Sequence, residues 1–152
     1  MSVIHKEGNI FDTEAPVIGH GVNVQGAMDS GLAATVKEQY PSVFENYKQV
    51  CEFGGLVGGT ALLLEADESE DGLMIANIAS QIEPGPNAEL KLLEDGLYDT
   101  VEQMRDMGVF HLALPKIGAG IGGLDWDVVL DAIESEAEVN PDFTIEVWTY
   151  TD

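Results

Sequence analysis

Two hydrophobic periods follow one another along the chain and divide it into short strands and longer helices. Short apolar runs bounded by turn residues are typical of strands. They lie at residues 2–5, 17–22, 60–65, 73–79, 109–114 and 143–149. Apolar residues that recur every three or four positions predict helices at residues 30–39, 41–53, 87–107 and 125–138. Strands that alternate with helices favour a three-layer α/β/α fold around a central sheet of about six strands.

Turn and cap residues add detail at the ends of these elements. Pro41 suits the first turn of a helix, because the N–H that proline lacks has no helical partner there. Gly108 suits the position just after a helix, where a left-handed backbone is common. The acidic stretch 65–72 predicts a turn between two antiparallel strands, so the sheet is expected to be mixed. In such sheets a ligand usually binds beyond the carboxyl ends of the strands.

The composition limits what the chain can bind. Its 152 residues suggest a single domain spanning residues 1–152, and 28 acidic against 6 basic residues give a formal charge of −22. Nucleic acids and anionic membranes attract proteins largely through Lys and Arg, so this charge argues against both as partners. Arg105 is the one arginine in the sequence, so an anionic ligand must be held mainly by backbone dipoles.

Cysteine and histidine usage points to a reducing compartment and to chemistry without a metal. The single cysteine, Cys51, excludes an intramolecular disulfide. His5, His20 and His111 lack the spacing of metal ligands. The sequence has neither a signal-peptide pattern nor an apolar run of the ~20 residues that a membrane helix needs. We therefore expect a cytoplasmic protein that needs no metal or cofactor, and we take it to be a monomer.

Two glycine-rich loops follow predicted strands and lead into predicted helices. The first covers residues 23–33 and the second covers residues 115–126. Glycine lets backbone N–H groups come close to a phosphate, and the start of a helix adds ~0.5 of a positive charge. Two such loops side by side could clamp a diphosphate without arginine, although each alone is also a common tight turn. Neither loop ends in the Gly-Lys-Ser/Thr pattern of the nucleoside triphosphate hydrolases.

The order of elements and both loops resemble a macrodomain, the module that binds ADP-ribose. The matching stretches cover nearly the whole chain and lie at residues 7–10, 22–23, 26–33, 114–126 and 145–150. The second loop, with the sequence LPKIGAGIGGLDW, is the most specific of them. Within the family, the chain looks most similar to the branch with terminal ADP-ribose glycohydrolases, antitoxin macrodomains that act on ADP-ribosylated DNA, and yeast-type ADP-ribose 1''-phosphatases. The resemblance implies ADP-ribose or an ADP-ribosylated molecule as the partner.

The resemblance also implies where each part of ADP-ribose binds. Asn9, with Ile10 beside it, matches the residue that accepts a hydrogen bond from the adenine amino group, and Trp148 matches the aromatic residue that stacks on adenine. The alternatives are that Asn9 only forms a turn, and that Trp148 packs in the core while Tyr150 stacks. The first loop is expected to hold the distal ribose through Asn23, Gly26, Ala27, Met28, Ser30, Gly31, Leu32 and Ala33. The second loop is expected to cover the diphosphate through Ile117, Gly118, Ala119, Gly120, Ile121 and Gly122.

The catalytic lysine of the related glycohydrolases has no counterpart in this sequence. That lysine follows the fourth strand, where residues 78–82 contain none. The remaining candidates are His20, as general acid or base at a phosphoester, and Asp29, as an activator of water. Each has a structural alternative, namely a buried hydrogen-bonded histidine and an exposed loop carboxylate. Lys116 is interpreted as a surface charge, and Asp125 as a helix cap.

Three functions fit these observations. The first is a domain that binds ADP-ribose or a terminal derivative of it in a cleft between the two loops, with hydrolysis of that derivative as an extension. The second is an enzyme that removes a 1''-phosphate from ADP-ribose or cleaves ADP-ribose from an acceptor. The third is a catalytically silent interaction domain. We expect the first, because glycine-rich loops cost backbone entropy and serve stability poorly.

Overall fold

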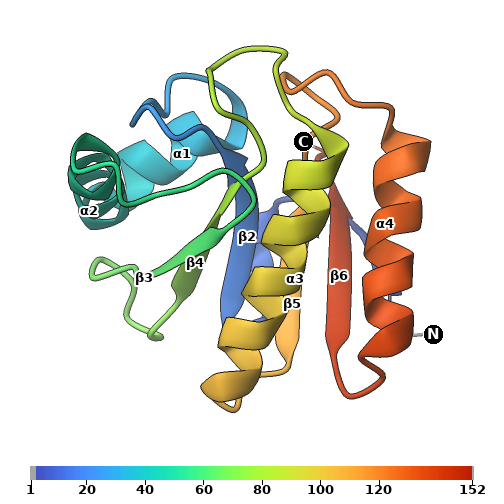
Figure 1. The fold of residues 1–152 in the computed structure, drawn as a ribbon. Coiled ribbons are helices and arrows are strands. Elements are labelled where there is room, and N and C mark those ends of the chain that lie inside the picture. Colours follow the sequence, from blue (N-terminus) through green and yellow to red (C-terminus); the bar gives the residue numbers. More distant parts are fainter. Residues whose placement is uncertain (1–2, 152) are drawn as a thin grey trace.

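Six strands form one mixed sheet in the order β1-β6-β5-β2-β4-β3 (Figure 1). The computed structural model describes residues 3–151. The strands are β1 (Val3–Glu7), β2 (Val17–Val22), β3 (Ala61–Glu65), β4 (Met74–Ala79), β5 (His111–Pro115) and β6 (Thr144–Thr149). Neighbouring strands are parallel except β3 and β4, which pair antiparallel across the acidic turn. The expected mixed sheet and its hairpin are therefore confirmed.

Helices cover both faces of the sheet, which confirms the three-layer arrangement. They are η1 (Ile10–Asp12, a single 3-10 turn), α1 (Gly31–Gln39), α2 (Pro41–Glu52), α3 (Leu90–Asp106) and α4 (Trp126–Val139). In Figure 1, α3 and α4 lie in front of the sheet, and their apolar residues share one core cluster with Ile78 and Leu114. The apolar residues of α1 and α2 form a second cluster with Ile18 and Ile75, which point to the other face.

Element boundaries differ from the prediction mainly at the start of the third long helix. Residues 87–89 were expected to be helical, but α3 begins at Leu90. The Asn87 amide donates to the Pro84 carbonyl at 2.7 Å, and the Ala88 N–H donates to the Gly122 carbonyl at 3.1 Å. These bonds hold the segment in a turn that contacts the second glycine-rich loop. The first strand was expected at residues 2–5 and is Val3–Glu7, with residue 2 outside the described residues.

The two predicted punctuation residues lie where they were expected. Pro41 occupies the first turn of α2. Gly108 follows α3 with a φ of 72°, a left-handed conformation that favours glycine. No helix among residues 3–151 is long and apolar enough to cross a membrane.

The loops that matter for function leave the sheet at one edge. The carboxyl ends of the parallel strands β2, β4, β5 and β6 meet at that edge, which is the top of Figure 1. Residues 23–30, 80–89 and 116–125 extend from it. The sheet therefore brings together both glycine-rich loops and the turn before α3, which are far apart in the sequence.

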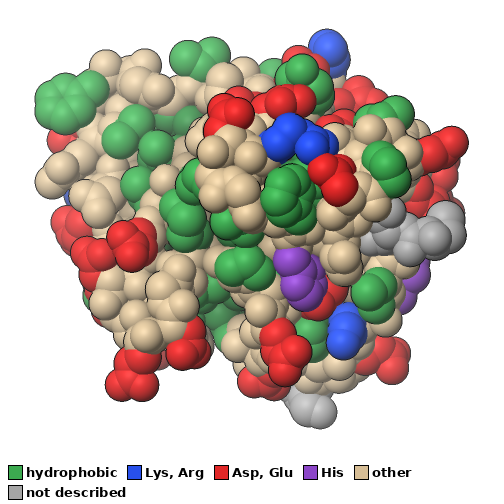
Figure 2. Space-filling view, turned by 90° about the horizontal axis from the view of Figure 1, so that it is seen from below, with side chains coloured by type: hydrophobic (Ala, Val, Ile, Leu, Met, Phe, Trp, Pro, Cys, Tyr) green, Lys and Arg blue, Asp and Glu red, His purple; other side chains and the backbone are tan. Residues whose placement is uncertain are grey.

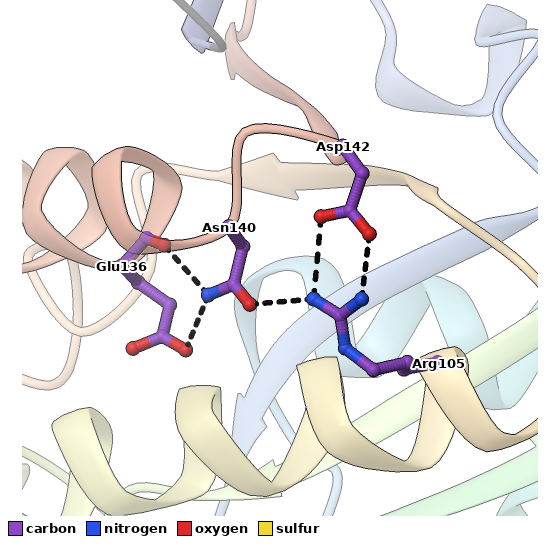
Figure 3. Close-up of polar contacts among 4 residues, drawn as sticks. All are labelled: Arg105, Glu136, Asn140 and Asp142. Carbon is purple, nitrogen blue, oxygen red and sulfur yellow. Dashed lines mark hydrogen bonds and ion pairs between the residues drawn. The ribbon is translucent and has the colours of Figure 1, made fainter.

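The single arginine stabilises the opposite end of the molecule (Figure 3). The Arg105 guanidinium, at the end of α3, donates to both carboxylate oxygens of Asp142 and to Asn140 Oδ1 at 2.7 Å. Asn140 in turn donates to the Glu136 carbonyl at 2.8 Å. The hydrogen bond from Arg105 lowers the pKa of Asp142. These bonds tie α3 to the connection between α4 and β6, so Arg105 has a structural role distant from the ligand loops.

Acidic side chains are spread over the face seen from below in Figure 2, with few basic ones among them. Within residues 3–151, only Asp29, Asp95 and Asp142 form ion pairs with a lysine or arginine. Most acidic side chains of the described residues therefore have no basic partner. Repulsion among them, at a net charge of −22, opposes the compact state.

We expect the melting temperature to rise between 0.1 M and 1 M NaCl, because the screening length falls from about 10 Å to about 3 Å. Calorimetry or circular dichroism at pH 7 measures this rise. At pH 4, where more carboxyl groups are protonated, the rise is expected to be smaller. A melting temperature that does not change with salt at pH 7 would contradict this prediction.

Candidate functional site

Two adjoining chambers open at the carboxyl edge of the sheet. The first has a volume of about 320 Å³ and is lined by both glycine-rich loops and the ends of β2 and β4. The second has a volume of about 460 Å³ and is lined by the turn after β1, by α1 and by the end of β6. Gly31, Leu32 and Pro115 line both chambers. The start of α1 and the end of β5 therefore form the neck between them.

Most residues singled out in the sequence line one of the two chambers. Asn9, Ile10 and Trp148 line the second chamber. His20 and Asp29 line the first, together with Asn23, Ala27, Ser30, Gly31, Leu32, Ala33, Ile117, Gly118, Gly120, Ile121 and Gly122. The three remaining residues, Gly26, Met28 and Ala119, are not among the lining residues of either chamber. Met28 is buried in the core, Gly26 lies near Lys48 and Cys51, and the Ala119 N–H donates to the Lys116 carbonyl.

Several lining residues were not predicted to be part of the site. Gly8, Phe11, Thr35 and Tyr150 complete the second chamber, although Tyr150 had been considered as a stacking residue. Gly21, Val22, Ser80, Gln81, Pro84, Gly85 and Lys116 complete the first. The position just after β4 could have been found from the rule that ligands bind at strand ends, although a serine there carries no signal of its own.

Asn23 determines the shape of the first loop. Its Oδ1 atom accepts from the N–H groups of Gln25 and Ala27 at 2.9 and 3.3 Å, and its Nδ2 atom donates to the Ala27 carbonyl at 2.9 Å. The buried Tyr47 hydroxyl donates to the Asn23 carbonyl at 2.7 Å. The Asn23 amide thus folds the loop over the first chamber, and its expected contact with the distal ribose stays a prediction.

Backbone N–H groups without an acceptor lie in the second loop, which lines the first chamber, and at the start of α1, which forms part of the neck. In the second loop, Gly118, Gly120, Ile121 and Gly122 donate no hydrogen bond within residues 3–151. At the start of α1, the described part of the chain likewise offers no acceptor to the N–H groups of Gly31, Leu32 and Ala33, and the Ser30 side chain makes no cap. Such groups, together with the positive end of a helix dipole, form a binding site for an anion such as a phosphate.

Glycine at position 122 is required by contacts that the loop makes with itself. A Cβ atom there would lie 2.8 Å from the Gly118 carbonyl oxygen and 2.9 Å from Ala88 Cβ. A side chain at this position would push the second loop away from the turn before α3.

His20 is a neutral hydrogen-bond acceptor at the floor of the first chamber. It is 2% exposed, and its Nε2 atom lies 2.8 Å from Asn77 Oδ1. The Asn77 amide donates to the Leu62 carbonyl at 2.9 Å, which identifies Oδ1 as the acceptor and places the proton on His20 Nε2. Burial lowers the pKa of His20 to about 4, outweighing the opposite effect of Asn77. The unprotonated Nδ1 atom has no partner among residues 3–151.

Ser80 adds a second unpaired polar group to the same chamber. It is 1% exposed, and its Oγ atom has no hydrogen-bond partner within the described part of the chain. A Cβ atom on Gly21 would lie 2.7 Å from this oxygen, so glycine in β2 makes room for the hydroxyl. Because buried polar groups are normally paired, Ser80 Oγ and His20 Nδ1 are candidates for a contact with a ligand or water, although neighbouring residues cover both atoms in this structure.

The charged residues of the first chamber lie at its rim. The Asp29 side chain is 76% exposed and lies 3.9 Å from Lys37 Nζ. Lys116 is exposed, and its Nζ atom lies 5.7 Å from the centre of the Trp126 ring. Asp125 Oδ1 accepts from the Asp127 N–H at 3.0 Å, which confirms its interpretation as a helix cap.

The second chamber has an aromatic wall and an amide wall. Trp148 is partly exposed, and its Nε1 atom donates to Glu146 Oε1 at 2.7 Å. Asn9 caps η1, because its Oδ1 atom accepts from the Phe11 N–H at 2.9 Å. This oxygen was expected, from the sequence, to accept from a ligand. The Phe11 N–H uses one of the two lone pairs of this oxygen, so Oδ1 can still accept from a ligand while the NH₂ can donate to one.

Comparisons with known proteins agree with this geometry. The family profile described as Macro domain matches residues 20–133. A DNA ADP-ribosyl glycohydrolase of Mycobacterium tuberculosis is 25% identical over 92% of this chain, which spans only 40% of that relative's length. An ADP-ribose 1''-phosphate phosphatase of Lodderomyces elongisporus is 27% identical, with 89% of this chain and 94% of the relative covered.

A solved structure extends the likeness to the fold. The structure titled "Thermosipho africanus DarTG in complex with ADP-ribose" is 25% identical in sequence, with a TM-score of 0.81. The matched region covers 93% of this chain and 40% of the chain in that structure. The profile match includes the end of β2, both glycine-rich loops and β5, so it covers the residues that line the first chamber. The chain belongs to the Macro domain family.

Proposed function

We propose that this chain binds ADP-ribose, with adenine in the second chamber, the diphosphate at the neck and the distal ribose in the first chamber. One observation carries the proposal. Unpaired N–H groups of Gly31, Leu32 and Ala33 lie at the start of α1, and those of Gly118 and Gly120–Gly122 lie in the second loop, and both segments line the first chamber. The two segments approach each other at Ile121, whose Cδ1 atom would lie 3.3 Å from a Cβ atom on Gly31. A diphosphate between two larger groups matches this order of an aromatic chamber, N–H donors and a polar chamber.

The charge distribution supports a small nucleotide over a large acceptor. Backbone N–H groups act on a phosphate at contact distance, whereas the net charge of −22 acts on large polyanions at long range. We therefore propose ADP-ribose or an ADP-ribosylated molecule other than nucleic acid as the partner. The expectation of a cytoplasmic monomer belongs to this proposal, and light scattering of the purified chain tests the oligomeric state.

Calorimetric titration with ADP-ribose tests the binding proposal. We expect saturable one-to-one binding, with ribose 5-phosphate binding much more weakly because it leaves the second chamber empty. The Gly122→Val variant is expected to lose most of the affinity, since its side chain would collide with the Gly118 carbonyl. Absence of binding to the unmodified chain at high micromolar ADP-ribose would reject the proposal.

A second proposal concerns hydrolysis, and His20 supports it. The unpaired Nδ1 atom is covered by the residues that line the first chamber, so a water molecule donates to it only when these residues shift as the distal ribose binds. If the ligand carries a 1''-phosphate, this water attacks the phosphorus and the bond from phosphorus to the ribose oxygen breaks. One proton of the water ends on that ribose oxygen and the other stays with the transferred hydroxyl, which yields ADP-ribose and inorganic phosphate. With a pKa of about 4 His20 is a weak base, so its main contribution is to orient the water.

Turnover of ADP-ribose 1''-phosphate, ADP-ribosylated protein and ADP-ribosylated DNA tests the second proposal. We expect phosphate release from the first substrate and a fall of about 100-fold or more in the His20→Ala variant. Turnover that depends on Asp29 and not on His20 would assign the role to the carboxylate. Binding of ADP-ribose without turnover of any substrate would leave a binding domain and reject hydrolysis.

The Asn9→Asp variant is expected to bind ADP-ribose more tightly, by about 1 kcal/mol. One carboxylate oxygen can keep the cap on the Phe11 N–H, and the second can accept from the adenine amino group. Calorimetry measures the gain. An analogue with hypoxanthine in place of adenine serves as the control, because its 6-oxo group cannot donate to the new oxygen. An equal gain for both ligands would show that the introduced carboxylate acts in another way.

A further inference from the structure

Glu146 is a buried carboxylate in the middle of β6 that accepts hydrogen bonds from three separate parts of the fold. It is 5% exposed. Its Oε1 atom accepts from the Thr13 hydroxyl at 2.6 Å and from the Trp148 indole at 2.7 Å. Its Oε2 atom lies 2.7 Å from His111 Nε2. All the contacts of this carboxylate are thus made to donors.

Two of these donors connect Glu146 to two elements that line the second chamber. Trp148 is the aromatic wall, and Glu146 holds its indole through the N–H. Thr13 ends the turn that carries Asn9, Ile10 and Phe11, and its own N–H donates to the Ile10 carbonyl at 3.0 Å. Glu146 is not among the lining residues, so it acts on the chamber through these two partners.

A carboxylate is a costly choice for this position if stability alone is served. Burial raises the pKa of Glu146, but the hydrogen bonds from Thr13, Trp148 and His111 outweigh burial and hold the pKa below its usual range. The side chain is therefore ionised in the folded protein. An apolar side chain would avoid the desolvation of a charge between strands, so the benefit of Glu146 lies in what it orients.

We propose that Glu146 is a positioning residue that sets the width of the base-binding chamber, by holding the Trp148 indole and the turn of residues 9–13 on one carboxylate oxygen. The inference rests on the proposed binding of ADP-ribose and adds a residue outside the contact surface. Its effect is confined to ligands that carry a base, because Thr13 and Trp148 do not line the first chamber.

Calorimetry on two variants of Glu146 tests this role. Glu146→Leu has a similar size and no acceptor, so it is expected to bind ADP-ribose about tenfold more weakly. Glu146→Gln keeps a carbonyl oxygen for Thr13 and Trp148, and its NH₂ can donate to the other tautomer of His111, so affinity is expected to stay within twofold or threefold of the unmodified chain. Ribose 5-phosphate is expected to bind all three forms equally.

A matched control and a double-mutant cycle separate positioning from general destabilisation. Asp99 is a partly buried carboxylate that accepts from the Ala61 N–H and from Gln103 on the other side of the sheet, so Asp99→Leu is expected to lower stability and leave ADP-ribose affinity unchanged. Trp148→Phe removes the indole N–H, so adding Glu146→Leu to it is expected to cost less than in the unmodified chain. Thr13→Val removes the bond to Glu146 and the bond that Thr13 Oγ1 accepts from the Ala15 N–H, and it tests the turn if Glu146→Leu fails to fold.

Different results would reject the inference and the proposed function. If the unmodified chain binds no ADP-ribose, the proposed function fails. If it binds and Glu146→Leu or Thr13→Val binds equally well, the positioning role fails alone. That role is also wrong if Glu146→Gln loses as much affinity as Glu146→Leu, or if ribose 5-phosphate loses affinity in parallel.

Discussion

Replacing Trp148 with alanine is expected to weaken ADP-ribose binding by about 1–3 kcal/mol, the scale of base stacking on an aromatic side chain. The indole forms a wall of the second chamber, and its N–H is held by Glu146. Lys6 Nζ lies 6.0 Å from the ring centre, and the turn approaches the ring closely at Gly8, where a Cβ atom would lie 3.6 Å from Cζ3. These contacts hold the indole in place before a ligand arrives, which reduces the entropy cost of stacking.

Calorimetric titration of the variant measures this loss, with circular dichroism to show that the fold is intact. Trp148→Phe retains an aromatic ring and is expected to lose less affinity than Trp148→Ala. Tyr150→Ala tests the other aromatic residue at the end of β6, which is 73% exposed and also lines the chamber. A larger loss for Tyr150→Ala than for Trp148→Ala would move the stacking role to Tyr150. Unchanged affinity in a folded Trp148→Ala variant would reject stacking on Trp148.

The free energy of unfolding is expected to fall by about 3 kcal/mol between pH 7 and pH 4 through His20 alone. In the folded protein, burial lowers the pKa of His20 from 6.5 to about 4. Between these values the unfolded chain binds a proton and the folded chain does not, so acid favours unfolding. Above pH 6.5 both states are neutral at this residue, and the contribution no longer changes with pH.

Urea unfolding of the unmodified chain and of His20→Gln at several pH values measures this contribution. Glutamine is neutral at every pH and can donate to Asn77 in place of the imidazole. The carboxyl groups titrate in both proteins, so the difference between the two stabilities isolates His20. A difference that stays constant from pH 7 to pH 4 would mean that the folded protein protonates His20 near its usual pKa.

The neutral state of His20 also narrows the proposed chemistry. At neutral pH the imidazole carries its one N–H proton on Nε2, which donates a hydrogen bond to Asn77 Oδ1. His20 therefore has no proton to give to a leaving group in the first chamber. A fixed lone pair on Nδ1 is suited to accept from a water molecule or a ribose hydroxyl. We therefore expect His20 to act as a hydrogen-bond acceptor at Nδ1 and not as a general acid.

Local sequence patterns predicted most of the fold. The strand and helix periods, Pro41 and Gly108 depend on neighbouring residues, and the structure confirms them. The prediction of the third long helix was wrong at its start, because residues 87–89 bond to a loop more than thirty positions later through the Ala88 N–H and the Gly122 carbonyl. Periodicity cannot register such a contact.

Part of the site could also be predicted, since glycine-rich loops at strand ends are visible in a sequence. Ser80, the Glu146 network and the role of Phe11 as a donor to Asn9 could not be predicted in the same way. Serine after a strand and glutamate in a strand are common surface residues, and only burial gives them another meaning. The cap that Asn9 makes on the Phe11 N–H was missed for a similar reason, since it depends on the fold of the turn, and acceptance from adenine stays a prediction.

By itself, the sequence determined the order and type of the elements, the lack of an arginine cluster for a ligand and the need for backbone donors, because these follow from residue type and spacing. The tertiary structure alone decided which polar atoms are occupied and which remain available. His20 meets Asn77 across 57 positions, and Glu146 meets Thr13 across 133. Burial sets the charge of His20, and hydrogen bonds between segments distant in sequence set its tautomer and hold the walls of the base chamber. Contacts of that range have no signature in a single sequence.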